Sequence, residues 1–283
     1  MAASGNGRAQ AKVRDEHVVV HRDEWAYIPH PCIAMAPNGD WLDAFKHTRR
    51  RGHILHPPDD PLYRTLVCRS VDQGHTWEQP HFAPHFNFSG TECPEIAATS
   101  GGRVLLTEFR RKWYPIGLAP QKREEGEPVE IKLPDRGWTG DFTPDDLDAA
   151  LFTWARGGGE TCAHVSEDNG LSFPRTIQID CSPYPAGYSR TGVVELADGR
   201  LAYAMQASWA DGPNRIFVVT SGDGGDSWSE PVQIVESTDQ AFAEPDLGYP
   251  VSIEYAPGRI FCCYYGQDEA GITYVQGSYV DLL

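Results

Sequence analysis

The chain has 283 residues, of which 40 are acidic and 24 basic, and its formal net charge is −16. Nucleic acids and anionic membranes are bound through basic surfaces, so this charge excludes both as expected partners. A local basic pocket for an acidic sugar is still compatible with it. The length is enough for one large domain with a sizeable core. The 28 glycines and 22 prolines favour many short strands joined by turns.

The seven cysteines show no spacing typical of a disulfide framework or a metal site. Because neither a CxxC nor an HExxH pattern occurs, no metal and no cofactor is expected. No apolar run reaches the length of a membrane span. Five cysteines lie in apolar, strand-like runs and are expected to be buried thiols: Cys32, Cys68, Cys162, Cys262 and Cys263.

The N-terminal stretch Met1–Glu16 is polar and lacks the apolar core of a signal peptide. It is therefore expected to be a flexible leader in a cytoplasmic protein, followed by a single domain over residues 17–283. The first predicted strand is the run His17–His21. We expect this strand to complete the last sheet of the domain, because the C-terminal repeat supplies only three strands and an unpaired sheet edge invites aggregation.

Four segments of the remaining chain align without a gap: residues 31–47, 94–110, 191–207 and 250–266. In each segment a glycine stands eight positions after the first residue, at Gly39, Gly102, Gly199 and Gly258. Glycine adopts the positive φ of a tight turn without steric cost, and apolar residues flank it on both sides. Each segment therefore predicts a strand, a tight turn and a second strand.

Three further segments share the pattern Ser-x-Asp-x-Gly-x-Ser/Thr-aromatic: residues 70–77, 166–173 and 221–228. The spacing of Asp and Gly suits a tight turn, because the carboxylate can accept hydrogen bonds from nearby backbone N–H groups. An alternating apolar run precedes each turn, so each copy predicts a strand, a turn and an aromatic residue that returns to the core. Three copies in one frame predict a repeat architecture, with the turn aspartates in structural roles.

One unit thus consists of two strands, a variable loop, a third strand, the Asp-Gly turn and a fourth strand. Four antiparallel strands per unit are typical of a propeller blade. The fold expected is an all-β propeller of four-stranded antiparallel blades, closed by the N-terminal strand. The second and third units are too far apart for one blade, so residues 112–150 are either an insertion or a degenerate blade. We favour the degenerate blade, which gives five blades, with four or six as alternatives.

The Ser-x-Asp-x-Gly turns resemble the Asp-boxes of the sialidase-like propeller superfamily, also called BNR-repeat proteins. The segment Asp246–Pro250, followed by Pro257–Ile260, is similar to the closing blade of that family. The resemblance covers residues 17–283. It implies a propeller, usually of six blades, in a superfamily that includes exo-sialidases, other glycoside hydrolases, uronide lyases and binding proteins. The fold alone does not indicate which of these activities the chain has.

The arginine triad of sialidases is not intact in this chain. Sialidases begin their first inner strand with Arg-Ile-Pro, whereas the matching residues here are Tyr27, Ile28 and Pro29. Arg190 is compatible with a second arginine of the triad, and no third is apparent. The resemblance therefore implies a sialidase-like fold without the usual means of binding the carboxylate of sialic acid.

In a propeller, the starts of the inner strands and the loops between second and third strands surround one mouth of the axis. Facing carboxylates there raise each other's pKa, which suits one of them to donate a proton, and arginines can hold a sugar carboxylate. The candidate catalytic residues at this mouth are Glu92, Glu95, Asp59, Asp60, His30, His53, Tyr188 and Arg190. The candidate substrate-binding residues are Arg49, Arg51, Arg110, Trp113, Gln206, Trp209, Asp246 and Tyr249.

Three functions are compatible with these residues. The favoured one is a glycoside hydrolase in which two carboxylates share the acid and base or nucleophile work on a glycosidic bond of a small saccharide or sugar acid. The second is a lyase that removes a proton beside the carboxylate of a uronic acid, with His, Tyr and Arg as catalytic groups. The third is a propeller that binds a sugar or a protein without catalysis. The sequence specifies neither the sugar nor the oligomeric state.

Efficient sialidase activity is not expected. Tyr27 stands where a charged arginine would pair with the substrate carboxylate, and losing such a charge-assisted pair costs about 2–5 kcal/mol of binding. The purified protein should therefore release sialic acid from an aryl sialoside only slowly. Rapid release in that assay would contradict the prediction.

Overall fold

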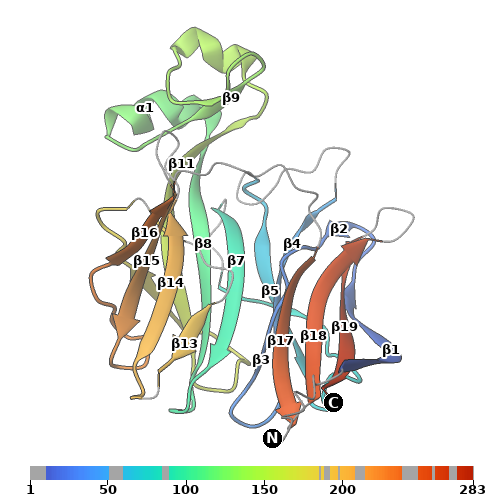
Figure 1. The fold of residues 1–283 in the computed structure, drawn as a ribbon. Helices are drawn as coiled ribbons and strands as arrows, with labels where there is room; N and C mark the ends of the chain where they lie inside the picture. The colour runs from blue at the N-terminus through green and yellow to red at the C-terminus, as the bar shows by residue number, and fades with distance from the viewer. Residues whose placement is uncertain are drawn as a thin grey trace, which may run out of the picture.

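The computed structural model describes residues 11–50, 60–84, 89–184, 186–187, 192–196, 198–207, 214–237, 248–256, 259–267 and 273–282. The chain is mostly β, and most of its strands belong to antiparallel sheets that stand side by side (Figure 1). Within the described ranges, one short α-helix and two 3-10 helices add to the strands, so the expectation of an all-β chain holds only in part. Among the described residues, no helix is long and apolar enough to cross a membrane.

Most of the described strands form four sheets, each of which contains the expected four antiparallel strands in order. The first sheet contains β3 (Cys32–Met35), β4 (Trp41–Arg49), β5 (Arg64–Ser70) and β6 (His81–Phe82), with β2 (Ala26–Tyr27) also paired to β4. The second contains β7 (Ser89–Ala98), β8 (Val104–Pro115), β11 (Trp154–Ser166) and β12 (Arg175–Ile179). The third contains β13 (Val193–Glu195), β14 (Leu201–Ala207), β15 (Asn214–Ser221) and β16 (Val232–Ser237). The fourth contains β17 (Gly248–Ala256), β18 (Arg259–Gln267), β19 (Thr273–Leu282) and β1 (Ala11–Arg22).

The hairpins predicted from the aligned segments are present. Gly39, Gly102 and Gly199 have φ values of 90°, 87° and 84°, in the left-handed region that glycine adopts readily. In the first turn the Ala36 N–H donates to the Asp40 carbonyl at 2.7 Å, and the same bond recurs in the other two turns at 2.9 and 2.7 Å. The fourth glycine, Gly258, lies outside the described residues, although β17 and β18 pair on either side of it.

The three Ser-x-Asp-x-Gly turns share one hydrogen-bonding pattern, which confirms the predicted turns. In each, the glycine N–H donates to the serine Oγ at 2.8–2.9 Å, and the N–H of the later Ser or Thr donates to the aspartate at 2.8–2.9 Å. Glycine is required at Gly74, where φ is 85° and an added Cβ would lie 2.7 Å from the Trp41 ring. The hydrogen bonds from Thr76 are the main reason why the pKa of Asp72 falls to about 2.

The N-terminal strand pairs with the C-terminal strand, as predicted. In β1, His17 to Val19 lie opposite residues 278–276 of β19, in antiparallel register. The strand is longer than expected, because its pairing begins with Ala11 opposite Leu282. Residues 11–16, expected to belong to a flexible leader, are therefore part of β1, in which residues 11–13 pair with β19 and a register shift lies between Val13 and His17.

The segment between β8 and β11 is an insertion. It contains the 3-10 helices Ile116–Leu118 and Pro144–Ala149, the helix α1 (Ala119–Glu124) and a two-stranded sheet of β9 (Ile131–Leu133) and β10 (Gly137–Thr139). Its own small core includes Val129, Ile131 and Phe142. It stands beyond the ends of β8 and β11 in Figure 1. The degenerate fifth blade expected over residues 112–150 is thus replaced by a small subdomain that extends one hairpin of the second sheet.

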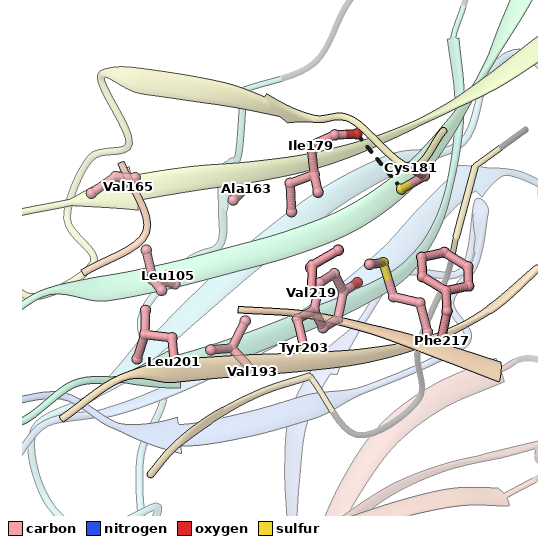
Figure 2. Close-up of a cluster of buried hydrophobic side chains, with 11 residues drawn as sticks. Leu105, Ala163, Val165, Ile179, Cys181, Val193, Leu201, Tyr203, Phe217 and Val219 are labelled. Atoms are coloured by element: carbon pink, nitrogen blue, oxygen red, sulfur yellow. Dashed lines mark hydrogen bonds between the residues drawn. The ribbon is translucent and has the colours of Figure 1, made fainter. Parts of the chain in front are cut away.

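Apolar clusters join neighbouring sheets one after another. Trp41 and Phe45 of the first sheet pack with Val275 and Tyr279 of the fourth. Side chains of β3, β4 and β5 pack with Ile96, Val104 and Leu106 of the second sheet. The second and third sheets share a cluster that surrounds Tyr203, β14 lying next to β8 and β11 in Figure 2. The order of packing is therefore fourth, first, second, third. Cys32, Cys68 and Cys162 are buried free thiols, as predicted.

Replacing the turn carboxylate should reveal its contribution to stability. Asp72 accepts hydrogen bonds from the Thr76 N–H and O–H at 2.8 and 2.6 Å, and its pKa in the folded chain lies below that of an unfolded chain. A group with a lowered pKa stabilises the fold above its unfolded pKa of about 4, and the effect is lost as pH falls towards about 2. Asp72→Asn should therefore lower the Tm at neutral pH by about 2 °C or more.

The measurement is the Tm of wild type and variant as a function of pH. The gap between them should narrow as the pH falls below about 4. Asp135→Asn is the control, because this side chain is 74% exposed and its nearest cation is 3.7 Å away. A gap that is independent of pH would show that the charge on Asp72 does not carry the effect.

Candidate functional site

Three buried side chains from two neighbouring sheets meet at the starts of β3 and β7. His30 directly precedes Pro31 and β3, and Glu92 and Cys93 lie on β7. Their donor atoms, an imidazole nitrogen, a carboxylate oxygen and a thiol sulfur, all lie within 4.8 Å of one another. The aligned repeats predicted that His30 and Glu92 would lie close together. Cys93 was not among the predicted site residues, because a single cysteine without a CxxC or similar spacing gives no sequence signal for a site.

The backbone around this cluster is unusual. His30 and Cys93 have φ values of 59° and 50°, in the left-handed region that costs a residue with a Cβ about 1–2 kcal/mol. They occupy equivalent positions, each directly before the proline that begins an aligned segment. The pairing of β7 with β8 also shifts register between Glu92 and Glu95. The bulge and the two left-handed residues together turn the side chains of the two strands towards each other.

Glu95 lies on the third-sheet side of the same region and is also buried. A Cβ at Gly192 would lie 2.9 Å from the Glu95 Cβ, so glycine is needed for the close approach of the third sheet. Burial raises the pKa of the Cys32 thiol well above its usual value, and the neighbouring Glu95 carboxylate adds to this. Burial also raises the pKa of Tyr203, with a smaller contribution from Glu95. Ionisable groups of the first three sheets therefore lie near one another here.

A second buried polar network lies next to this cluster and was missed by the sequence analysis. The Lys46 Nζ of β4 donates to Thr65 of β5 at 2.8 Å and to Glu108 of β8 at 3.2 Å. Glu108 also accepts hydrogen bonds from Thr65 and from His164 Nε2, which lies 3.2 Å away and must carry the proton because a carboxylate only accepts. Burial opposes ionisation of Glu108, but Lys46 and His164 together hold its pKa at about 2.

Four other predicted residues have specific places in the structure. Asp60 is buried and accepts the Leu62 N–H at 2.9 Å, which makes it a turn residue before β5. Arg49 is exposed at the end of β4. Arg110 forms an ion pair with Glu160, directly opposite on β11, at 2.5 Å. Trp113 is only 5% exposed and packs against Trp138 and Trp154. The assignment of these four residues to the site is still a prediction.

The remaining predicted residues are not described by the structure. The side chains of Gln206 on β14 and Tyr249 on β17 lie outside the described part. The following residues lie wholly outside it: Arg51, His53, Asp59, Tyr188, Arg190, Trp209 and Asp246. Their assignment to the site is still a prediction. Tyr27, compared above with the first arginine of sialidases, is buried and packs edge-on against Tyr63, with 6.5 Å between ring centroids.

An aromatic cluster on the insertion was also missed. Phe152 stacks on Trp154 with ring centroids 4.9 Å apart, and Trp138 lies 5.9 Å from Phe152. The Arg156 guanidinium lies 4.5 Å from the centre of the Trp138 ring and also pairs with Glu130 at 2.5 Å. The sequence analysis assigned this segment to a blade and did not expect its aromatic side chains to gather. They join the insertion to the end of the second sheet.

These sheets and turns define a mostly antiparallel β fold, and comparisons with known proteins show that this fold is sialidase-like. No family model matches the chain. An exo-alpha-sialidase of Aspergillus fumigatus is 25% identical over 219 residues, which cover 75% of this chain and 48% of that protein. The chain thus spans about half the length of the curated relative that it matches.

Solved structures support the same fold. A protein of unknown function from Dyadobacter fermentans has a TM-score of 0.64 and 16% identity, covering 96% of this chain and 99% of that chain. The NanB sialidase from Streptococcus pneumoniae has a TM-score of 0.53 and 13% identity, covering 94% of this chain and 54% of that chain. At these identities the likeness establishes the fold alone.

Removing the buried carboxylate of the second network should destabilise the protein strongly. Glu108→Gln would leave the buried Lys46 ammonium without its anion, at a cost of about 3–5 kcal/mol in the free energy of unfolding. Adding Lys46→Met should recover part of this loss, because the uncompensated charge is then gone. Chemical denaturation of the wild type, the two single variants and the double variant tests both points. If Glu108→Gln is as stable as wild type, the ion pair of Lys46 and Glu108 is not required for stability.

Proposed function

We propose that the four sheets are blades of a propeller and that the protein is a carbohydrate-active enzyme, whose reactive centre is formed by Glu92, Glu95 and His30. The order of four antiparallel strands, their packing one after another and the likeness to sialidases support the propeller. Each of the four described sheets would form one blade of this propeller. The substrate is a small saccharide or sugar acid.

The observation that carries the proposal is the meeting of buried ionisable groups at the starts of two inner strands. Glu92 lies within 4.8 Å of His30, and both are less than 10% exposed. Charged and polar side chains are rarely buried unless they are paired or functional, and left-handed backbone at two of the converging residues is typical of functional sites. These residues lie at the strand starts. In sialidase-like propellers, which this chain resembles, the strand starts surround the mouth where catalysis is expected.

Hydrolysis is the reaction that these residues support best. One carboxylic acid would protonate the leaving oxygen of a glycosidic bond, while the other carboxylate would act as base on water or as nucleophile. Glu92 and Glu95 supply the two carboxyl groups from one strand. The bulge between them gives the two side chains different surroundings. Asp60, the third candidate acid that the structure describes, is bonded to a turn. The proposal therefore places the chemistry on Glu92 and Glu95.

Elimination from a uronic-acid glycoside is the second candidate, because His30 lies beside Glu92 and an imidazole can take a proton from carbon next to a carboxylate. The products distinguish the two reactions. An unsaturated uronide absorbs in the near ultraviolet, whereas the products of hydrolysis do not.

The test is a screen of aryl glycosides and uronic-acid oligosaccharides, followed by kinetics on the best substrate. Glu92→Gln and Glu95→Gln should each lower kcat at least about a hundredfold, the lower range for loss of an acid–base group. Glu78→Gln is the matched control, since this carboxylate is 53% exposed and pairs with Arg69 on the surface of the first sheet. Its kinetics should equal those of wild type.

Two outcomes would contradict the proposal. Normal turnover by both variants would place the chemistry elsewhere. Sugar binding without turnover by the wild type would indicate a binding protein. Circular dichroism and Tm measurements on each variant separate a loss of catalysis from a loss of fold.

A further inference from the structure

We propose that His30, Glu92 and Cys93 bind one divalent transition-metal ion, most favourably zinc. This inference goes beyond the proposed function and does not require it, because it concerns metal binding by the chain in the absence of any sugar. It differs from the expectation from the sequence that no metal is bound.

The geometry is the first support. The three donor atoms lie within 4.8 Å of one another. In a tetrahedral zinc site with bonds of about 2.0–2.3 Å, pairs of donor atoms are about 3.3–3.8 Å apart. Movements of about 1 Å, which rotation of the three side chains can supply, would therefore close the distances around one ion.

The chemistry of the donors is the second support. Imidazole nitrogen, thiolate sulfur and carboxylate oxygen are the three types of protein ligand that zinc uses. Magnesium and calcium prefer sites made only of oxygen, so a set that includes a thiol disfavours both. A neutral His30, a Cys93 thiolate and a Glu92 carboxylate also carry two negative charges, which a divalent ion balances. Such balance matters because all three side chains are buried.

The Lys46 ammonium lies close to the cluster, and its contacts are compatible with a metal ion bound there. The Lys46 ammonium interacts electrostatically with Cys93 and Glu92, but its hydrogen bonds go to Thr65 and Glu108. Glu108 supplies the anion that balances it at 3.2 Å. The charge of Lys46 is therefore balanced within the neighbouring network.

The scaffold holds the donors in place. Glu92 and Cys93 are consecutive on β7, where the bulge breaks the usual alternation of side chains, and His30 is fixed by its left-handed backbone before Pro31. Three protein ligands leave at least one coordination position for water or a substrate oxygen, as in catalytic rather than structural zinc sites.

Metal binding is tested on the full chain, prepared without a polyhistidine tag and treated with a chelator that is then removed. After equilibrium dialysis against micromolar Zn²⁺ or Co²⁺, bound metal is measured by mass spectrometry. We expect one equivalent per chain. Bound Co²⁺ should give a thiolate-to-metal charge-transfer band in the near ultraviolet, which reports a cysteine ligand in the unaltered protein. A wild type that retains no metal, or that binds Co²⁺ without this band, would overturn the proposal.

Variants locate the site. Cys93→Ser and His30→Gln should weaken binding by more than the roughly 10–100-fold that loss of an outer-shell partner costs, and Cys93→Ser should abolish the band. Cys162→Ser and His75→Gln are controls, because Cys162 lies buried on β11 and His75 is 58% exposed at a turn. Both should bind as wild type. Unchanged binding by Cys93→Ser and His30→Gln would place the metal elsewhere and refute the assignment.

The proposed metal site and the proposed enzyme can each be refuted without the other. Stoichiometric metal with a thiolate band but no turnover of any sugar would leave the metal site standing and remove the proposed enzyme. Sugar turnover by a chain that binds no metal would do the reverse.

Discussion

The ion pair between Lys46 and Glu108 is the constraint on which the packing of the first two sheets depends. Both side chains are almost completely buried, so neither can exchange its partner for water. Glu108 is held by β4, β5 and β11 at once, through Lys46, Thr65 and His164, and His164 extends the chain of bonds to Thr176 on β12. An apolar contact tolerates small shifts, whereas this network fixes the relative position of the two sheets because each bond is directional.

The candidate site follows from the repetition of one backbone unit. His30 and Cys93 stand at the same position of successive units, directly before the proline of each aligned segment, and both adopt a left-handed φ. Packing of the first sheet against the second then brings the two positions together. A repeat that serves mainly to build a fold thus also gathers unlike side chains at one place. The chemistry depends on which residue each unit carries there.

Much of the fold could be predicted from the sequence, because its signals are local. The turns at Gly39 and Asp72 are determined by residues within a few positions, and the aligned segments placed His30 and Glu92 in one region. Lys46 and Glu108 could not be found this way, since each is a charged residue whose partner is 62 positions away in another sheet. For the same reason Arg110 looked available for substrate, although Glu160 lies opposite it. The insertion was misassigned because a faint repeat pattern says nothing about strand pairing.

The pairing of β1 with β19 has a consequence for how the chain folds. Residues 11–22 are synthesised before the first, second and third sheets, whereas their partners, residues 273–282, are synthesised after them. Until β19 has been made, β1 has no partner strand. It also carries exposed apolar surface, since the Val19 side chain is 55% exposed even in the finished fold. The first, second and third sheets can form from nearby segments during synthesis, but the fourth requires closure of almost the whole chain, which is slow for contacts so distant in sequence. Newly made protein therefore passes through a state that is competent to exchange its first strand with a second molecule.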